Sequence, residues 1–341
     1  MPDIKNLPSK GFPHDYDTIT LSASAQTAIT LRGEGVETKM TLTPDGAGVI
    51  ALQGFAAILR DLTSDGKART FTLSVGIQNY SFKVLPCKID LAVSTADFIA
   101  RHFLTLQRGE KVTYDGATEV LTFCNAGDTP ETPTVQALFY NPDTNKPWTG
   151  TYTDVLKTST QGDGFFRLEF NVGDFISRSN GLLLHSITVK VGAREARYTI
   201  ANTMVRRPTT ILYKNAFWQD DTFHFFGTTL TELKPDRSSA SFSGKARNYR
   251  VSSIPEYRLT TGLLRPESFD AFKDVCSAEV AYLDVHGRPE VCITENELKL
   301  SDDLHEVQQG TLTFRFSQGV RLYDPNDPVR TFDKTFDKTF K

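Results

Sequence analysis

The chain has 341 residues and a formal net charge of −3, from 38 basic and 41 acidic side chains. This near-neutral balance lacks the basic surplus of nucleic-acid-binding proteins, so no nucleic-acid partner is expected. One hydrophobic core rarely grows beyond about 250–300 residues, and the length therefore predicts two or three domains. Abundant Phe, Tyr and Thr favour β-strands, because aromatic and β-branched side chains fit a pleated surface.

The N-terminal ten residues lack the apolar core of a signal peptide, and no apolar run approaches the roughly 18 residues of a membrane span. We therefore expect synthesis in the cytoplasm, with no signal peptide and no membrane span. The four cysteines are scattered, have apolar neighbours and form no C-x-x-C pair, which predicts buried free thiols in a reducing compartment. A bridge between Cys276 and Cys292 stays open as an alternative, because both lie in one compact region.

Residues 1–91 contain short segments in which apolar and polar residues alternate, such as 27–31 and 70–75. Alternation of this kind places the apolar residues on one face of a strand. One stretch, 54–62, has apolar residues at helical spacing. This part of the sequence predicts an N-terminal β-domain with one short helix.

Residues 92–207 open with a capping box, Ser94 and Asp97, which predicts a helix over 97–107. His102 lies on the apolar face of this helix and is expected to be a core histidine. Short strands separated by Gly, Pro, Asn and Asp turns are then predicted, and this spacing is typical of an antiparallel β-sandwich-like domain. The predicted strands are 120–124, 135–140, 150–156, 165–170, 182–191 and 197–200.

Residues 208–325 begin with the densest aromatic run of the chain, 211–227, in which two apolar segments flank the polar tetrad 218–221. This pattern predicts a β-hairpin with a tight turn, and His224 is expected on its solvent side. A long hairpin is predicted to pair 239–250 with 256–260 around a turn at 252–255. The remaining predicted elements of this C-terminal β-hairpin domain are a helix over 266–277, a hairpin over 280–294 and a strand over 312–316.

Residues 326–341 contain a Thr-Phe-Asp-Lys repeat. Its even period places Phe332, Phe336 and Phe340 on one face of an extended strand. Disordered tails are poor in aromatic residues, so we expect this C-terminal arm to dock, either on its own body or on a neighbouring subunit. The alternative is that it contacts nothing. The whole sequence thus predicts a mainly β protein of tandem antiparallel β-sandwich-like domains, with a few short helices and an extended C-terminal arm.

The sequence offers no catalytic, cofactor-binding or metal-binding signature. Neither G-x-S-x-G, a P-loop nor G-x-G-x-x-G occurs, and the six histidines have no metal-ligand spacing. Acidic pairs at 220–221, 302–303 and 324/327 could hold calcium, but aspartates in turns commonly bond to their own backbone. We therefore expect no enzyme activity and no cofactor, and an enzyme of unrecognised type stays a remote alternative.

Cationic and aromatic residues gather on the predicted long hairpin and form the candidate interface, namely Lys245, Arg247, Tyr249, Arg250 and Tyr257. Such a cluster can hold an anionic partner or a sugar. The structural alternative is an edge hairpin whose charges protect it against aggregation.

Several segments resemble tail or baseplate proteins of tailed phages and prophages of gut bacteria. They are I-L-Y-K-N-A-F at 211–217, G-K-A-R-N-Y-R at 244–250, T-G-L-L at 261–264 and the terminal repeat at 330–340, with 58–62 and 98–106 similar too. The resemblance implies a non-enzymatic, β-rich virion protein that forms oligomers with itself and with other virion proteins. No site residues carry over from it.

A second hypothesis is a glycan-binding or adhesion module. Tyr140, Trp148 and Tyr152 would stack on sugars of a host surface. The competing expectation for Trp148 is that it covers one end of a sandwich.

Overall fold

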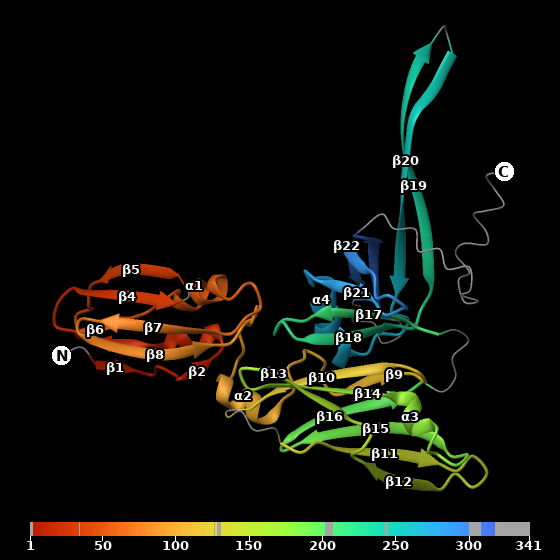
Figure 1. Cartoon of the computed structure of the whole chain (residues 1–341), viewed down its shortest axis with the longest axis horizontal. Coiled ribbons are helices and arrows are strands. Elements are labelled where there is room, and N and C mark those ends of the chain that lie inside the picture. Colours follow the sequence, from red (N-terminus) through yellow and green to blue (C-terminus); the bar gives the residue numbers. More distant parts are fainter. Residues whose placement is uncertain are drawn as a thin grey trace.

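The computed structural model describes residues 3–33, 35–125, 127, 131–201, 207–242, 245–299 and 308–317 (Figure 1). It is mainly β, with 49% strand and 13% helix, and this confirms the predicted mainly β, multidomain fold. Each of its five sheets draws all its strands from one of the three segments 1–91, 92–207 and 208–325. The C-terminal arm at 326–341 lies outside the described residues.

The N-terminal segment forms a three-stranded and a five-stranded sheet around one apolar core. The smaller sheet has the order β1-β3-β6, with β1 (Asp3–Lys5), β3 (Thr20–Ser22) and β6 (Val49–Ala51). The larger has the order β2-β8-β7-β4-β5, with β2 (Lys10–Gly11), β8 (Gln78–Val84), β7 (Arg69–Val75), β4 (Thr27–Gly33) and β5 (Val36–Leu42). A 3-10 helix η1 (Pro13–Thr18) and the predicted helix α1 (Phe55–Leu62) accompany these sheets.

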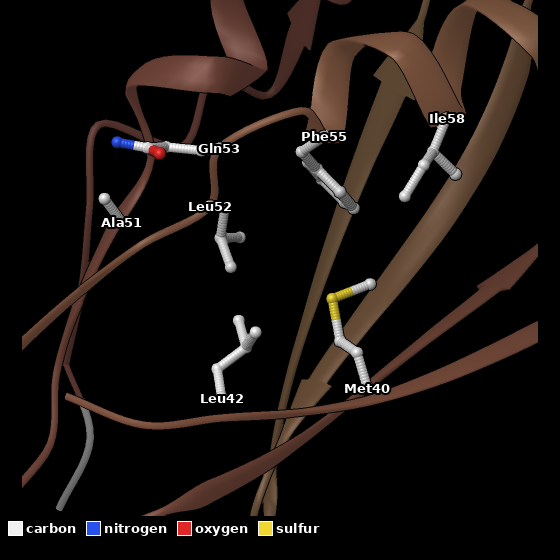
Figure 2. A pocket seen from close by; sticks show the side chains of 7 residues that line it. All are labelled: Met40, Leu42, Ala51, Leu52, Gln53, Phe55 and Ile58. Atoms are coloured by element: carbon white, nitrogen blue, oxygen red, sulfur yellow. The ribbon is translucent and has the colours of Figure 1, made fainter.

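The side chains of β5 are less covered than those of its neighbour β4. In β4, Ile29 and Leu31 are fully buried, whereas no residue of the edge strand β5 is. Beside β5 lies a cavity of about 240 Å³, lined by Met40, Leu42, Ala51, Leu52, Gln53, Phe55 and Ile58. Figure 2 shows the side chains of β5 facing those of α1 across this space. The N-terminal core is therefore open on its β5 side.

The middle segment forms two sheets that enclose a second core rich in aromatic residues. One has the order β10-β14-β13, with β10 (Thr118–Cys124), β14 (Phe165–Asn171) and β13 (Lys157–Gly162). The other has the order β12-β11-β15-β16-β9, with β12 (Pro147–Tyr152), β11 (Thr134–Tyr140), β15 (Leu183–Val191), β16 (Arg194–Ile200) and β9 (Glu110–Thr113). Helix α2 (Thr95–Arg101) precedes these sheets, and α3 (Val172–Ile176) follows β14.

The strand pairs are antiparallel except for two, β2 with β8 and β9 with β16, among the residues that the structure describes. Strand β13 was not predicted, because its sequence K-T-S-T-Q-G is exposed throughout and carries no apolar alternation.

The predicted helix over 97–107 is too long, because α2 ends at Arg101. The next residues leave the helix to enter two different cores, Phe103 in the middle segment and Leu104 at the junction described below. The Leu104 N–H donates to the Thr122 carbonyl, at 2.8 Å. His102 caps the helix end and is exposed, so its prediction as a core histidine is wrong.

The third segment forms one seven-stranded sheet with the order β18-β17-β21-β22-β23-β20-β19. Its strands are β17 (Thr209–Lys214), β18 (Asp220–Phe225), β19 (Thr229–Phe242), β20 (Lys245–Thr260), β21 (Ala281–Leu283), β22 (Glu290–Lys299) and β23 (Gln309–Phe316). A 3-10 turn η2 (Pro266–Ser268) leads into α4 (Phe269–Cys276), as the Pro-initiated helix pattern predicted. The hairpin over 211–227 is confirmed as β17 and β18, and Trp218 adopts a positive φ of 57° in its turn.

The long hairpin has a different turn from the predicted one. The predicted turn at 252–255 lies inside β20, where Pro255 is opposite Leu233 of β19. Strand β23 pairs only with Tyr257–Thr260 of β20, so Pro255 needs no hydrogen bond on that side and is tolerated. The strands β19 and β20 thus continue beyond the sheet as a two-stranded ribbon (Figure 1).

All three segments meet in one small core. Phe12 and Leu85 come from the first segment, Ile99, Leu104, Cys124 and Phe165 from the second, and Phe217 from the third. The ring centroids of Phe12 and Phe217 are 5.5 Å apart. This shared core fixes the three segments against one another.

Candidate functional site

The most distinctive polar site is a buried charged cluster between the middle and third segments. Its centre is Glu119 of β10, which is fully buried, and His224 of β18, which is 5% exposed. The prediction that His224 faces solvent is therefore wrong. Strand β18 is covered on both faces, by α4 against Phe223 and by β10 on the side of His224, so alternation along the strand does not separate core from solvent.

Both carboxylate oxygens of Glu119 are bonded. Lys111 Nζ of β9 lies 2.8 Å from Oε2, and the Thr222 hydroxyl donates to the same oxygen at 3.0 Å. The other oxygen, Oε1, accepts from the Thr113 hydroxyl and lies 2.7 Å from His224 Nε2. Lys111 also donates to the backbone carbonyl of Thr222, at 2.6 Å. The cluster thus ties β9 and β10 to β18.

The two ring nitrogens of His224 have partners on different segments. Nε2 meets Glu119, and Nδ1 lies 2.8 Å from the Thr210 hydroxyl of β17. That hydroxyl lies 3.0 Å from the Tyr114 hydroxyl of the middle segment. The imidazole is therefore held at both ends.

A second carboxylate, Asp221, continues the cluster. Its Oδ2 accepts from the Thr105 hydroxyl at 2.6 Å, and its Oδ1 lies 3.8 Å from Lys111 Nζ. The neighbouring Asn215 donates to the Leu104 carbonyl at 2.6 Å, across the same junction. Further along, Asp274 of α4 accepts from the Ala216 N–H at 3.2 Å.

The carboxyl groups of the cluster have opposite pKa shifts. Burial alone would raise the pKa of Glu119, but the charges of Lys111 and His224 outweigh it, so this pKa lies well below its usual range. Burial raises the pKa of Asp221 despite the nearby Lys111 charge. Burial, with the charge of Asp221 second, raises the pKa of Asp274 to about 7. Glu119 is thus held as the anion that balances Lys111.

The order hydroxyl, imidazole, carboxylate in Thr210, His224 and Glu119 has the connectivity of a hydrolase triad. Catalysis needs a hydroxyl that a substrate can reach, and Thr210 is only 3% exposed. Its oxygen already contacts Tyr114, and Lys111 occupies the second oxygen of Glu119. The geometry therefore fits a structural contact between the middle and third segments rather than a catalytic site.

The sequence did carry one signal for this cluster. Glu119 directly precedes the mainly apolar run 120–124 of the same strand, and a buried acid needs a partner. Lys111 and His224 could not be assigned as those partners, because they lie on other strands and His224 is 105 residues away.

The residues of the candidate interface fall into three groups. Tyr257 packs against the apolar core of the third segment, where its ring stacks on Phe314 with centroids 5.3 Å apart. Lys245 is exposed, and Arg247, Tyr249 and Arg250 lie on β20 within the ribbon. Phe332, Phe336 and Phe340 lie outside the described residues. A role for these residues in assembly stays a prediction.

The three aromatic residues proposed for glycan stacking lie on different faces of one sheet. Trp148 is 49% exposed and packs beside Phe139, with ring centroids 5.5 Å apart. Tyr140 pairs with Pro147 and so belongs to the other face, where it meets His185. Tyr152 shares the side of Trp148 and contacts Phe175. The three side chains therefore do not form one platform.

The two aspartates of the candidate calcium site at 220–221 form ion pairs with basic side chains of the same chain. Asp220 lies 2.7 Å from Lys214 and 3.1 Å from Arg167, and Asp221 belongs to the buried cluster. Within the described ranges, no group of three or more His, Cys, Asp or Glu side chains is placed to hold a metal. The acidic pairs at 302–303 and 324/327 lie outside those ranges.

The cysteine prediction holds in part. All four thiols are free, so the alternative bridge between Cys276 and Cys292 is not formed. Cys87 and Cys124 are buried and Cys276 is half-buried, but Cys292 is exposed, contrary to the prediction. It lies on β22 opposite Arg315, on the face away from the core.

Comparison with models of known protein families finds no match for this chain. A search of curated proteins finds none either. Among the described helices, none is long and apolar enough to cross a membrane. The resemblance to phage tail and baseplate proteins therefore stays a prediction.

Proposed function

We propose that the chain is a non-enzymatic structural protein of a phage tail tip or baseplate, which assembles with copies of itself and with other virion proteins. The observation that carries the proposal is the β19–β20 ribbon. Strand β20 runs from Lys245 to Thr260, and only its last four residues pair with β23. Two strands without a core are marginally stable in water, so such a ribbon gains its stability from a partner.

The charge of the ribbon indicates what kind of partner it meets. Residues 233–254 carry five basic side chains and one acidic side chain, a net charge of +4 in a chain whose total is −3. The register shift between Ser238 and Ser239 leaves Tyr249 unpaired as a bulge. Arg247 and Arg250 lie on either side of this bulge in β20. An acidic protein surface fits such a basic segment.

The body that carries the ribbon is suited to a structural role. The shared apolar core and the Glu119–Lys111–His224 cluster hold three segments in one arrangement. A rigid body lets an assembly keep a fixed geometry when its subunits repeat around an axis. The resemblance of the sequence to tail and baseplate proteins supports the same role, and the chain would reside in the virion.

The test removes the ribbon and leaves the sheet. Residues 234–254 are replaced by Asn-Gly, which joins Leu233 to Pro255 through a two-residue turn. We expect the body to keep its thermal unfolding midpoint, because the replaced residues lie beyond the pairs with β23. Assembly, measured by sedimentation velocity and by incorporation into phage particles, should be lost.

Two controls accompany this variant. A chain lacking residues 326–341 separates the contribution of the C-terminal arm from that of the ribbon. Antibody labelling of purified particles then asks whether the intact chain is present in virions. A wild-type chain that stays monomeric at all concentrations, and is absent from particles, would contradict the proposed function.

A further inference from the structure

The open side of the N-terminal core combines two features that suit an incoming strand. Strand β5 is the last strand of its sheet, where it pairs with β4 and presents a free backbone edge in the described structure. The apolar cavity lies directly beside that edge, between β5 and α1 (Figure 2). An added strand would complete the sheet and cover the cavity in one step.

The side chains of β5 alternate in a way that matches this geometry. Val36, Thr38, Met40 and Leu42 are half-buried and face the interior, whereas Glu37, Lys39 and Thr41 are exposed. A strand laid beside β5 would continue the same alternation, with every second residue over the cavity. The incoming strand must therefore place an apolar side chain inward and polar ones outward.

The cavity has the size of an aromatic side chain. Its volume is about 240 Å³, and a cavity of about 150 Å³ suffices for benzene. Its lining is apolar apart from Gln53. Ile58, which borders it, is 36% exposed, so the cavity opens to the surface.

One segment of this chain has the required pattern. In the repeat at 331–340, extended alternation places Phe332, Lys334 and Phe336 on one face and Thr and Asp residues on the other. A phenylalanine ring fits the cavity, and the lysine two residues further on can keep its stem on apolar surface while its ammonium group stays in water. The exposed Asp61 lies one turn after Ile58 on α1 and offers that ammonium a counter-charge.

We propose that β5 accepts the C-terminal arm, residues 326–341, of a second copy of this chain as an added strand, with one phenylalanine ring in the cavity. This inference rests on the proposed function and names the acceptor of the arm. Strand β5 lies in the N-terminal segment (Figure 1), whereas strand β23, after which the described chain ends, lies in the seven-stranded sheet of the third segment. Donation from one copy to the next therefore builds a head-to-tail contact, which closes into a ring or extends into a filament.

The test uses two full-length variants that each lack one half of the contact. The donor-defective variant carries Phe332→Ala, Phe336→Ala and Phe340→Ala. The acceptor-defective variant carries Ile58→Glu, which places a charge at the mouth of the cavity. Sedimentation velocity should show each variant associating at least about tenfold more weakly than the wild type, because a buried aromatic contact is lost.

Mixing the two variants decides between copies and self-docking. The donor-defective chain keeps its acceptor and the acceptor-defective chain keeps its arm, so the mixture should associate more strongly than either variant alone. The matched control is Ile77→Glu, at an isoleucine of the same domain that is 84% exposed, and it should assemble like the wild type. Leu42→Lys, at the β5 side of the cavity, serves as a second acceptor variant if Ile58→Glu unfolds.

The outcomes separate this inference from the proposed function. If both acceptor variants assemble as well as the wild type, the assignment of β5 as the acceptor is wrong, while the proposed role in assembly stands. If the mixture associates no more strongly than either variant alone, although each variant is folded, arm exchange between copies is wrong. A monomeric wild type would overturn both.

Discussion

His224 Nε2 lies 2.7 Å from Glu119 Oε1, although the two residues belong to different sheets and are 105 residues apart. Both side chains are buried, so solvent does not screen their interaction. Removing one partner of a buried charged network leaves an uncompensated charge. The contact therefore makes the Glu119 carboxylate a link between the middle and third segments, in addition to their shared apolar core.

Glu119→Gln should destabilise the chain by about 3–5 kcal/mol, because Lys111 would stay buried without its anion. The midpoint of denaturant unfolding measures this change, and limited proteolysis should reveal earlier cleavage near the junction. Glu297→Gln, at an exposed glutamate of β22, is the control and should change stability by less than about 0.5 kcal/mol. Equal unfolding midpoints for the two variants would show that the cluster contributes no net stability.

Asp274→Asn should change how stability depends on pH. The folded pKa of Asp274 is raised from 3.8 to about 7, so the folded state binds more protons than the unfolded state between these values. Stability from this group is therefore fully present below about pH 4 and is lost as pH rises toward 7. The asparagine keeps an oxygen for the Ala216 N–H and carries no charge.

At pH 8, the Asp274→Asn variant should therefore be more stable than the wild type by about 1–3 kcal/mol, and at pH 4 the two should be alike. Urea unfolding at several pH values from 4 to 8 measures the difference. Asp270→Asn is the control, at a half-buried aspartate on the same helix that pairs with Arg108 at the surface. A stability difference that does not vary with pH would contradict the assignment.

Sequence-based prediction succeeded for elements in which the spacing of apolar residues marks a single buried face. Helices α1 and α4 follow this rule, because each packs one face on a single core. The rule fails where tertiary contacts decide. Helix α2 ends early because Phe103 and Leu104 enter two cores, and β13 escapes notice because it is exposed on both faces.

The buried cluster shows a different limit. The alternation of apolar and polar residues along a strand predicts which face packs on the core of its own segment. His224 is instead buried by β10, which belongs to the middle segment. The ribbon shows a third limit, since the turn residues of 252–255 are present but β19 pairs straight past them. At 252–255, the many cross-strand hydrogen bonds between β19 and β20 outweigh the local preference of these residues for a turn.

One thiol should react far faster than the others in the folded chain. Cys292 is exposed, whereas burial raises the pKa of Cys87 and of Cys276 to about 12 and also raises that of Cys124. A thiol-specific reagent at pH 8 should modify one cysteine rapidly and the rest only on unfolding, because the thiolate is the reactive form. Cys292→Ser should remove the fast phase, and Cys276→Ser should leave it. A fast phase that survives Cys292→Ser would contradict the exposed position.

The positive charges of the ribbon should govern assembly. Arg247→Glu with Arg250→Glu reverses two charges beside the bulge of β20, whereas Lys67→Glu with Lys299→Glu reverses two exposed charges outside the ribbon. Like charges across an interface repel, so the double variant should associate at least about tenfold more weakly, with the loss shrinking at 0.5 M salt. Sedimentation velocity at low and high salt measures both effects. Because the lysine variant changes the net charge of the chain by the same amount, it controls for total charge and should associate nearly as the wild type does. Equal losses for the two variants would show that association depends on total charge alone.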